Sequence, residues 1–221
     1  MAEICIIDDG IVPQKYTHIK SVHRFRVRNG AFGPDDRQYV PTSHGSICAM
    51  ILDKYLDYKV DLISINIMEA CEKGNIENLL VALRWCFFHR LKFISLSCGT
   101  TDKSDRIPLA KILRHNAASM IFAAESNRNI KTYPASFSSV IGVRCNPQFF
   151  HNRFRFLEND ENGIEIEAAG IHQLMIGSTR ILTPPCSSYA TPMICAKFSS
   201  IALKKELYQK ESLIKHLYNE V

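Results

Sequence analysis

The chain has 221 residues, of which 46% are hydrophobic and 22% charged, and its formal net charge at pH 7 is +5. This is the composition of an ordinary globular protein that is long enough to bury one substantial core, so we expect a single domain over residues 1–221. The sequence has no apolar run of about eighteen residues and no basic start followed by an apolar leader, which excludes a predicted membrane span or signal peptide.

The eight cysteines lie mostly inside apolar runs, such as those around Cys86 and Cys195, and no two of them have the Cys-x-x-Cys spacing. This pattern favours reduced thiols in the core over a disulfide framework, and it gives no support for a metal site. The arginines of residues 23–28 alternate with apolar residues, which is typical of a half-exposed strand and favours a solvated face over a nucleic-acid groove. We therefore expect no metal, no cofactor and no nucleic-acid partner.

Short apolar runs bounded by turn residues alternate with longer stretches of helical spacing. This pattern predicts an α/β protein with a three-layer α/β/α architecture and a mostly parallel central sheet. In chain order, the predicted elements are a strand at 4–7, a helix at 45–55, a strand at 62–67, a helix at 76–89, a strand at 93–96, a helix at 107–116, and strands at 120–124 and 140–144.

Two later segments are predicted from different signals. Residues 149–167 mix aromatic and basic side chains with a turn-rich stretch at 159–163, which suggests a surface hairpin. Beyond Pro192 the sequence becomes helical, and residues 203–218 are charged with a narrow apolar stripe. That stripe predicts a terminal helix docked on the body of the protein.

Three polar residues stand at positions where α/β proteins build their sites. Asp8 ends the first predicted strand, His44 precedes a predicted helix, and Ser188 lies where a loop enters an apolar helix. The carboxyl ends of parallel strands commonly carry functional residues. Each residue alone has an ordinary structural interpretation: a turn for Asp8, a structural side chain for His44 and a helix N-cap for Ser188.

Together, the order and the local sequence of these residues resemble the three signature motifs of the subtilisin-like serine peptidases. Residues 7–10 read IDDG, where the family has an apolar residue followed by Asp, by Ser or Thr, and by Gly. Residues 44–50 read HGSICAM, where the family has HGTHVAG, and residues 186–192 read CSSYATP, where the family has GTSMATP. The third motif is the strongest match. The resemblance implies a serine endopeptidase with Asp8, His44 and Ser188 as its catalytic triad.

Two further segments carry the same resemblance. Residues 122–127 read FAAESN and resemble the family's AAGN stretch, which implies that Asn127 donates a hydrogen bond to the oxyanion. Residues 133–136 read YPAS, as in the family segment whose Tyr-Pro bond is often cis, so we expect a cis bond at Pro134.

The resemblance also implies the substrate-binding residues. Residues 94–99 read ISLSCG and resemble the family strand that borders the specificity pocket and pairs with the substrate backbone. A peptide substrate is therefore expected beside residues 97–99, with Gly74 on its other side. Glu125 and Ser126 replace small family residues at the pocket, which predicts a narrower or more polar pocket. The implied substrate-binding set is Ser97, Cys98, Gly99, Gly74, Glu125 and Ser126.

Departures from the secreted members of the family narrow the expected location and substrate of the protein. The sequence starts a few residues before Asp8 and contains no acidic calcium loop, which predicts folding without a pro-segment. With reduced cysteines and no export signal, the expected location is the cytoplasm, where an unrestrained protease would be harmful. We therefore expect a restricted substrate, such as the leader of a modified precursor peptide or of a small subunit. The oligomeric state is left open.

Two alternatives remain. A catalytically silent relative that binds peptides or assembles with a partner is one, because Cys186, Ser187 and Ser126 replace small family residues near the site. A serine-directed phosphonate that labels Ser188 would separate it from an enzyme. A nucleotide-binding α/β domain is the weaker alternative, because no glycine-rich fingerprint follows the first strand and no phosphate loop is present.

Overall fold

The computed structural model describes residues 2–68, 75–116 and 118–219. Its main sheet is built from nine strands in the described part of the chain: β1 (Ala2–Asp8), β2 (Ile19–Arg28), β3 (Ala31–Pro34), β4 (Val60–Asn66), β5 (Phe93–Leu96), β6 (Met120–Ala124), β7 (Ile141–Cys145), β8 (Phe154–Phe156) and β9 (Ile166–Ala168). The spatial order is β3-β2-β4-β1-β5-β6-β7-β9-β8. Neighbours from β2 to β9 are parallel, and only β3 and β8 at the edges run antiparallel.

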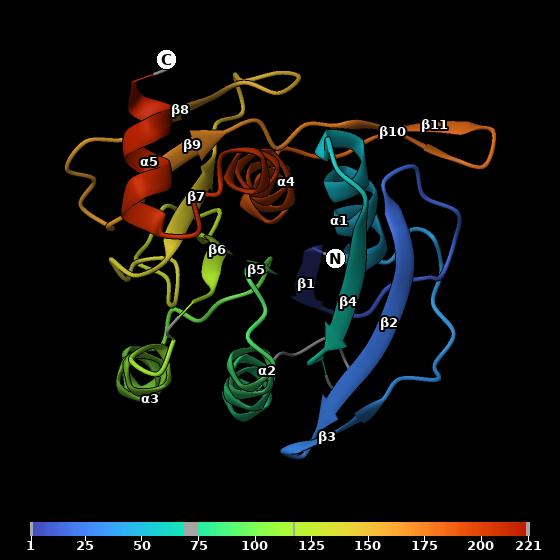
Figure 1. The fold of residues 1–221 in the computed structure, drawn as a ribbon, viewed down its shortest axis with the longest axis horizontal. Helices are drawn as coiled ribbons and strands as arrows, with labels where there is room; N and C mark the ends of the chain where they lie inside the picture. The colour runs from blue at the N-terminus through green and yellow to red at the C-terminus, as the bar shows by residue number, and fades with distance from the viewer. Residues whose placement is uncertain (1, 69–74, 117, 220–221) are drawn as a thin grey trace.

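Helices cover both faces of this sheet (Figure 1). One face carries α1 (His44–Tyr55), α4 (Ser187–Lys205) and α5 (Lys210–Tyr218), and the other carries α2 (Ile76–Phe88) and α3 (Arg106–Leu113), which follows a short 3-10 turn, η1 (Lys103–Asp105). The three-layer α/β/α architecture with a mostly parallel sheet is thus confirmed. None of these helices combines the length and the apolar composition that crossing a membrane requires.

Each face of the sheet has its own hydrophobic core. Ile4 and Ile6 of β1 pack with residues of α1, α4 and α5, whereas Cys5 and Ile7 pack with residues of α2 and α3. This alternation follows from the period of two along a strand. A parallel sheet buried on both faces needs continuous apolar strands, which explains why the short apolar runs of the sequence mark the strands.

Most predicted elements lie close to the observed ones. The bounds of β5 and β6 are those predicted, and α1 and α2 differ from the prediction by one residue at one end. Helix α3 ends three residues earlier than predicted. Three strands had no prediction: β3, and the pair β10 (Gln173–Ile176) and β11 (Thr179–Leu182), which forms a separate antiparallel hairpin.

The segment 149–167 is a hairpin with most of its residues at the surface, as predicted, but one of its strands also lies within the central sheet. Strands β8 and β9 are antiparallel to each other, and β9 also pairs in parallel with β7. The hairpin therefore extends the central sheet, and Ile166 and Ala168 are buried in the core. Only three residues form β9, at the end of a turn-rich stretch, so its alternation is too short to stand out in the sequence.

The single terminal helix predicted at 203–218 is wrong. Helix α4 begins at Ser187, before Pro192, and ends at Lys205; Glu206 then adopts a left-handed conformation with φ 58°. A residue in this conformation ends a helix. Helix α5 is separate, and Leu213 and Leu217, four residues apart, fix it to the core.

Candidate active site

Asp8 lies at the centre of the sheet, at the carboxyl end of β1, between the parallel neighbours β4 and β5. It is 2% exposed, and its Oδ1 accepts a hydrogen bond from the backbone N–H of Asp9 at 2.8 Å. A carboxylate this deeply buried is tolerated only when it is paired and hydrogen-bonded. Its other partner is the imidazole of His44.

His44 connects the carboxylate to the serine. Its Nδ1 lies 2.9 Å from both carboxylate oxygens of Asp8, and its Nε2 lies 2.9 Å from Ser188 Oγ. An ionised carboxylate only accepts hydrogen bonds, so Nδ1 carries the hydrogen and Nε2 is free to accept the one on Ser188 Oγ. The ring also stacks on Tyr189, with centroids 4.9 Å apart. The three predicted triad residues are therefore brought together in hydrogen-bonding order.

The start of α1 is held against the end of β1 by Asp9. The N-cap residue, Ser43, makes no side-chain cap, and Asp9 instead accepts the N–H groups of His44 at 3.1 Å and Gly45 at 2.7 Å. A Cβ at Gly45 would lie 2.5 Å from the backbone oxygen of Gly10, so only glycine fits this approach. Such capping contacts stabilise a helix by about 0.5–2 kcal/mol. Asp9, a departure from the family motif, thus positions His44.

Ser188 is the second residue of α4, where the first backbone N–H groups have no partner within the helix. Further along, Pro192 lacks the N–H that would bond to the carbonyl oxygen of Ser188. The thiol of Cys48 donates to that oxygen instead, at 3.6 Å. The N-terminal part of α4 is therefore fixed against α1 by a contact at the backbone of Ser188.

Cys48 lies one helical turn after His44, and its sulfur is 3.7 Å from His44 Nδ1 and 3.3 Å from Ser97 Oγ. Burial raises the pKa of Cys48 to about 11, so the thiol is neutral at pH 7. The donor atoms of Asp8, His44 and Cys48 lie within 4.8 Å of one another, close enough to share a metal ion. Their hydrogen bonds to one another and to Ser97 account for this arrangement without an ion.

The pKa of His44 is shifted by opposing effects. Burial lowers it, while the neighbouring Cys48 and the carboxylate of Asp8 raise it. The net direction is upward, and we attribute it to the ionised Asp8, because the Cys48 thiol is neutral at pH 7. The site therefore stabilises the imidazolium form, which is the form that a general base reaches after accepting a proton.

Asn127 is held beside Ser188 by contacts with the two residues that precede it. Its Oδ1 accepts the backbone N–H of Ser187 at 2.9 Å, and its Nδ2 donates to Cys186 Sγ at 3.1 Å. The same sulfur is 2.8 Å from Ser188 Oγ. Cys186, which the sequence marked only as a departure from the family motif, thus lies between the Asn127 amide and the Ser188 hydroxyl.

A cavity of about 350 Å³ opens beside Ser188, a volume at the lower end of the range for small-molecule sites. Five of the six predicted substrate-binding residues line it together with Asn127 and Ser188. The sixth, Gly74, lies outside the described residues. The lining residues are Ser97, Cys98, Gly99, Thr101, Ala124, Glu125, Ser126, Asn127, Thr132 and Ser188.

The carboxylate of Glu125 in this wall is neutralised by Arg144 of β7. The two side chains form a bidentate ion pair at 2.5 and 3.1 Å, and Asn162 donates a further hydrogen bond to Glu125 at 2.8 Å. Arg144 also pairs with Asp160 at 2.8 Å. The hydrogen bond with Glu125 raises the pKa of Arg144. The cavity therefore has a polar wall fixed by an ion-pair network of two carboxylates and one guanidinium. No sequence signal connected Glu125 with Arg144, which are 19 positions apart.

The predicted cis bond between Tyr133 and Pro134 is confirmed, and it lies next to Thr132, one of the residues that line the cavity. The backbone of Tyr133 pairs with Thr100 in both directions, each hydrogen bond being 2.8 Å long. A Cβ at Gly99 would lie 2.8 Å from the carbonyl oxygen of Tyr133. The close approach of these two segments thus requires the glycine.

Comparison with known proteins supports the fold. No protein-family model and no curated protein sequence matches the chain. Among 215 matching chains of solved structures is the crystal structure of a cold-adapted subtilisin-like serine proteinase, with 14% sequence identity and a TM-score of 0.66. The match covers 96% of this chain and 79% of that one. The chain therefore has a subtilisin-like fold; at this identity the likeness shows the fold alone, and the catalytic assignment depends on the geometry above.

Proposed function

We propose that the protein is a single-domain serine endopeptidase in which Asp8, His44 and Ser188 form the catalytic triad. The observation that carries the proposal is the position of the His44 ring. Its Nδ1 lies 2.9 Å from the carboxylate of Asp8, and its Nε2 lies 2.9 Å from Ser188 Oγ. Three segments far apart in the sequence converge to make these contacts. The geometry is that of a nucleophile, a base and a group that orients the base.

The proposed reaction has two halves. As Ser188 Oγ attacks the carbonyl carbon of the scissile peptide bond, its proton passes to His44 Nε2, and Asp8 stabilises the imidazolium. His44 then protonates the leaving amine as the C–N bond breaks, which leaves an acyl-enzyme. Water attacks the acyl carbon in the second half, with its proton going to His44, and Ser188 regains a proton as the carboxylic acid product leaves.

The oxyanion of each tetrahedral intermediate would be met by Asn127 Nδ2 and by the backbone N–H of Ser188, which has no partner within α4. Removing one such donor in sites of this kind costs about 3–4 kcal/mol of transition-state stabilisation. The sulfur of Cys186 now accepts the hydrogen bond of Asn127, so the substrate oxygen must displace it.

The proposed substrate is an extended peptide that pairs with residues 97–99 and places one side chain in the cavity beside Ser188. The polar wall at Glu125 and Ser126, which the ion pair with Arg144 holds in place, favours a restricted choice of side chain there. The family resemblance and the free cysteines support a cytoplasmic role, namely removing the leader of a modified precursor peptide or of a small subunit.

One observation favours the second candidate, a catalytically silent peptide-binding or assembly protein. The sulfur of Cys186 is in contact with both Asn127 Nδ2 and Ser188 Oγ. If this sulfur were never displaced, the oxyanion site would stay closed. The two candidates therefore differ in whether Ser188 reacts.

We expect Cys186→Ala to raise kcat/KM by roughly two- to tenfold, because the substrate no longer replaces a hydrogen bond worth about 0.5–1.5 kcal/mol. Cys186→Ser, which keeps a polar atom at this position, is the matched control and should stay close to the natural protein. Steady-state hydrolysis of one peptide by the three proteins measures the effect. A rate for Cys186→Ala at or below that of the natural protein would contradict the displacement step.

The decisive test of the proposed function is labelling with a fluorophosphonate, followed by digestion and mass spectrometry. We expect one phosphonyl group on Ser188, a strong decrease in the labelling rate for His44→Ala, and full labelling of Ser187→Ala. A protein that keeps its fold but gains no label at Ser188 would support the silent candidate.

A further inference from the structure

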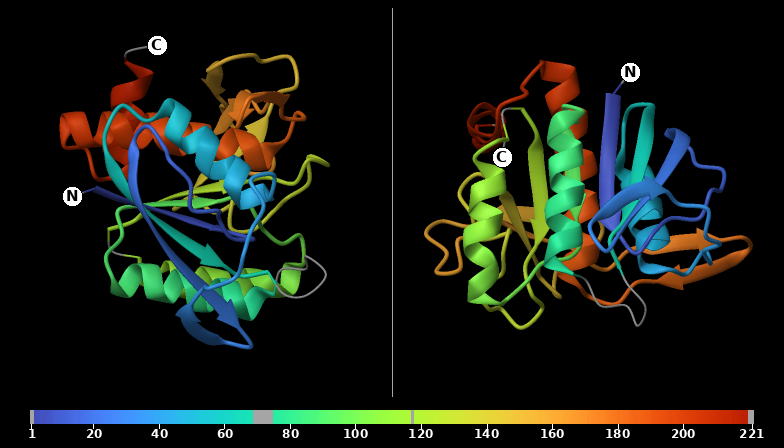
Figure 2. Two further views of the ribbon diagram at one scale, coloured as in Figure 1. Left: turned by 90° about the vertical axis from the view of Figure 1, so that its right-hand side faces the viewer. Right: turned by 90° about the horizontal axis from the view of Figure 1, so that it is seen from below.

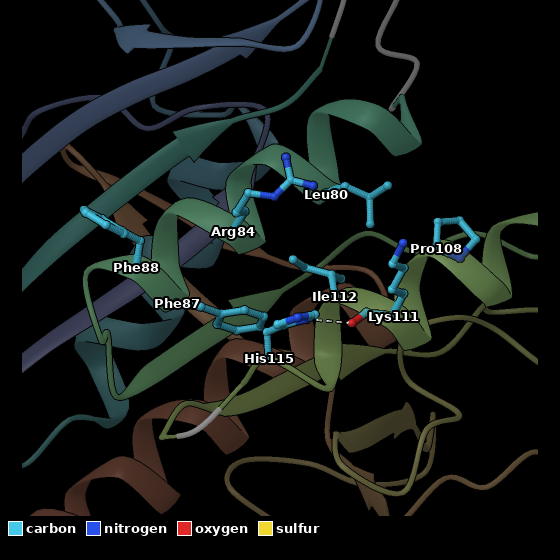
Figure 3. Close-up of a pocket in the computed structure, with 8 residues that line it drawn as sticks. All are labelled: Leu80, Arg84, Phe87, Phe88, Pro108, Lys111, Ile112 and His115. Carbon is cyan, nitrogen blue, oxygen red and sulfur yellow. Dashed lines mark hydrogen bonds between the residues drawn. The ribbon is translucent and has the colours of Figure 1, made fainter.

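A second, larger cavity lies on the other face of the sheet, between α2 and α3, which run side by side (Figure 2). Its volume is about 510 Å³, and none of its residues contributes to the site around Ser188. Figure 3 shows the residues that line it: Leu80, Arg84, Phe87, Phe88, Pro108, Lys111, Ile112 and His115. The cavity is therefore a groove between two parallel helices, and we call it the α2–α3 groove.

The lining residues follow helical periodicity on both sides. On α2 they stand at positions 80, 84, 87 and 88. On the other side they stand at positions 108, 111 and 112 of α3 and at position 115, two residues after its end. Leu80, Phe87 and Ile112 form an apolar floor. Phe88, the last residue of α2 and one of the lining residues, is a large apolar side chain that is 82% exposed. An apolar groove with such an exposed side chain at its rim is typical of a binding site for another apolar surface.

The described residues that line the groove carry charge of one sign. Among them, Arg84 and Lys111 lie on opposite helices and none is a carboxylate. Within the described residues, neither of these two cations forms an ion pair. His115 bonds through Nδ1 to the backbone oxygen of Lys111 at 3.0 Å, which leaves its Nε2 available (Figure 3). A complementary ligand would carry carboxylates beside apolar side chains.

The groove begins at the edge of the sheet that carries Ser188. Helix α2 follows β4 and α3 follows β5, and each returns to the next parallel strand, so both helices start at the carboxyl edge of the sheet. Gly99 of the substrate cavity follows the carboxyl end of β5, and Pro108 of the groove lies in the first turn of α3, so both lie toward this edge of the sheet. A chain that extends from Ser188 along this edge would reach the start of the groove.

We propose that the α2–α3 groove binds an acidic amphipathic helix that belongs to the substrate and lies outside the cleaved segment. Helix-in-groove recognition uses apolar side chains at i, i+3, i+4 and i+7, the spacing that two adjacent helices accept. Helix α2 has 13 residues and is about 20 Å long, which matches a ligand helix of three to four turns. The inference rests on the proposed function, because it names the substrate feature that an endopeptidase of restricted specificity reads.

Binding is measured first, with the full chain carrying Ser188→Ala so that the probe is not cut. The probe is a fluorescein-labelled amphipathic helix with leucines on one face and glutamates on its flanks, and the matched probe has lysines in place of the glutamates. We expect saturable binding of the acidic probe, at least a tenfold loss in the double variant Arg84→Glu, Lys111→Glu, and a gain for the basic probe in that variant. Phe88→Ala, a change at an exposed side chain, should also weaken binding of the acidic probe.

Three results would overturn the proposal: equal binding of the two probes, unchanged binding of the acidic probe by the double variant, or no saturable binding. In a second experiment the active protein cleaves a short peptide with and without the acidic helix fused to it. We expect a higher kcat/KM with the helix in the natural protein only, and equal cleavage of the short peptide by the double variant.

The two failures are distinguishable. Cleavage of the short peptide without binding of the acidic probe would contradict the groove and leave the peptidase intact. Binding of the probe by a protein that cleaves nothing would support the groove and contradict the peptidase.

Discussion

Replacing Ser188 with alanine is expected to lower kcat by a factor on the order of 10⁶, the loss that removal of the nucleophile causes in an enzyme with this triad. The reason is that Ser188 Oγ lies 2.9 Å from His44 Nε2 and, in the proposed mechanism, is the atom that forms the acyl-enzyme. The oxyanion donors and substrate binding remain, so a residual rate of about 10³–10⁴ over water is expected. Product formation from a peptide, followed by mass spectrometry, measures both rates.

The neighbouring Ser187 provides the matched control. Its hydroxyl is buried and accepts the backbone N–H of Cys145 at 3.1 Å, without contacting His44. Ser187→Ala should therefore keep kcat and lose only about 1 kcal/mol of stability. Retained activity in Ser188→Ala, together with loss of activity in Ser187→Ala, would show that the wrong serine has been assigned.

Replacing Asp8 with asparagine is expected to lower kcat by about 10⁴, because the amide can hold the imidazole in the wrong tautomer and cannot stabilise its cation. The variant should also move the pH profile. Only neutral His44 acts as a base, so kcat/KM increases as the pH rises through the pKa of His44. In the natural protein Asp8 raises this pKa above its ordinary value of 6.5, and the acidic limb of the profile should lie above that pH.

Removing the negative charge in Asp8→Asn lowers the pKa of His44, so the acidic limb should shift to lower pH while the maximal rate decreases. Asp9→Asn is the control, because Asp9 contacts the backbone of α1 and makes no hydrogen bond to the His44 ring. An acidic limb at the same pH in Asp8→Asn and in the natural protein would contradict the assignment of Asp8 as the partner of His44.

The sequence predicts the central strands well because a strand that is buried on both faces appears in the sequence as an apolar run. Strands such as β5 and β6 consist wholly of buried residues, and their apolar runs end at turn residues. The edge of the sheet leaves a weaker trace, since β8 and β9 have three residues each. The break between α4 and α5 depends on Glu206, a left-handed residue that is not glycine, so nothing in its type signals the end of a helix.

The residues of the candidate site likewise differ in how far the sequence predicts them. Asp8, His44 and Ser188 were predictable because each stands in a local motif, and the motifs have a fixed order along the chain. Cys48 had a usable signal, its spacing of four residues from His44 on one helix. The contact of Cys186 with Asn127 had none, because it depends on how a loop after β6 meets the start of α4.

The most direct test of the triad is a crystal structure of the protein after reaction with a fluorophosphonate. We expect a bond between phosphorus and Ser188 Oγ, with a phosphonyl oxygen about 2.7–3.1 Å from Asn127 Nδ2 and the sulfur of Cys186 displaced. His44 should remain between Asp8 and the modified serine. Phosphorus on another residue, or a phosphonyl oxygen directed away from Asn127 with His44 separated from Ser188, would contradict the account.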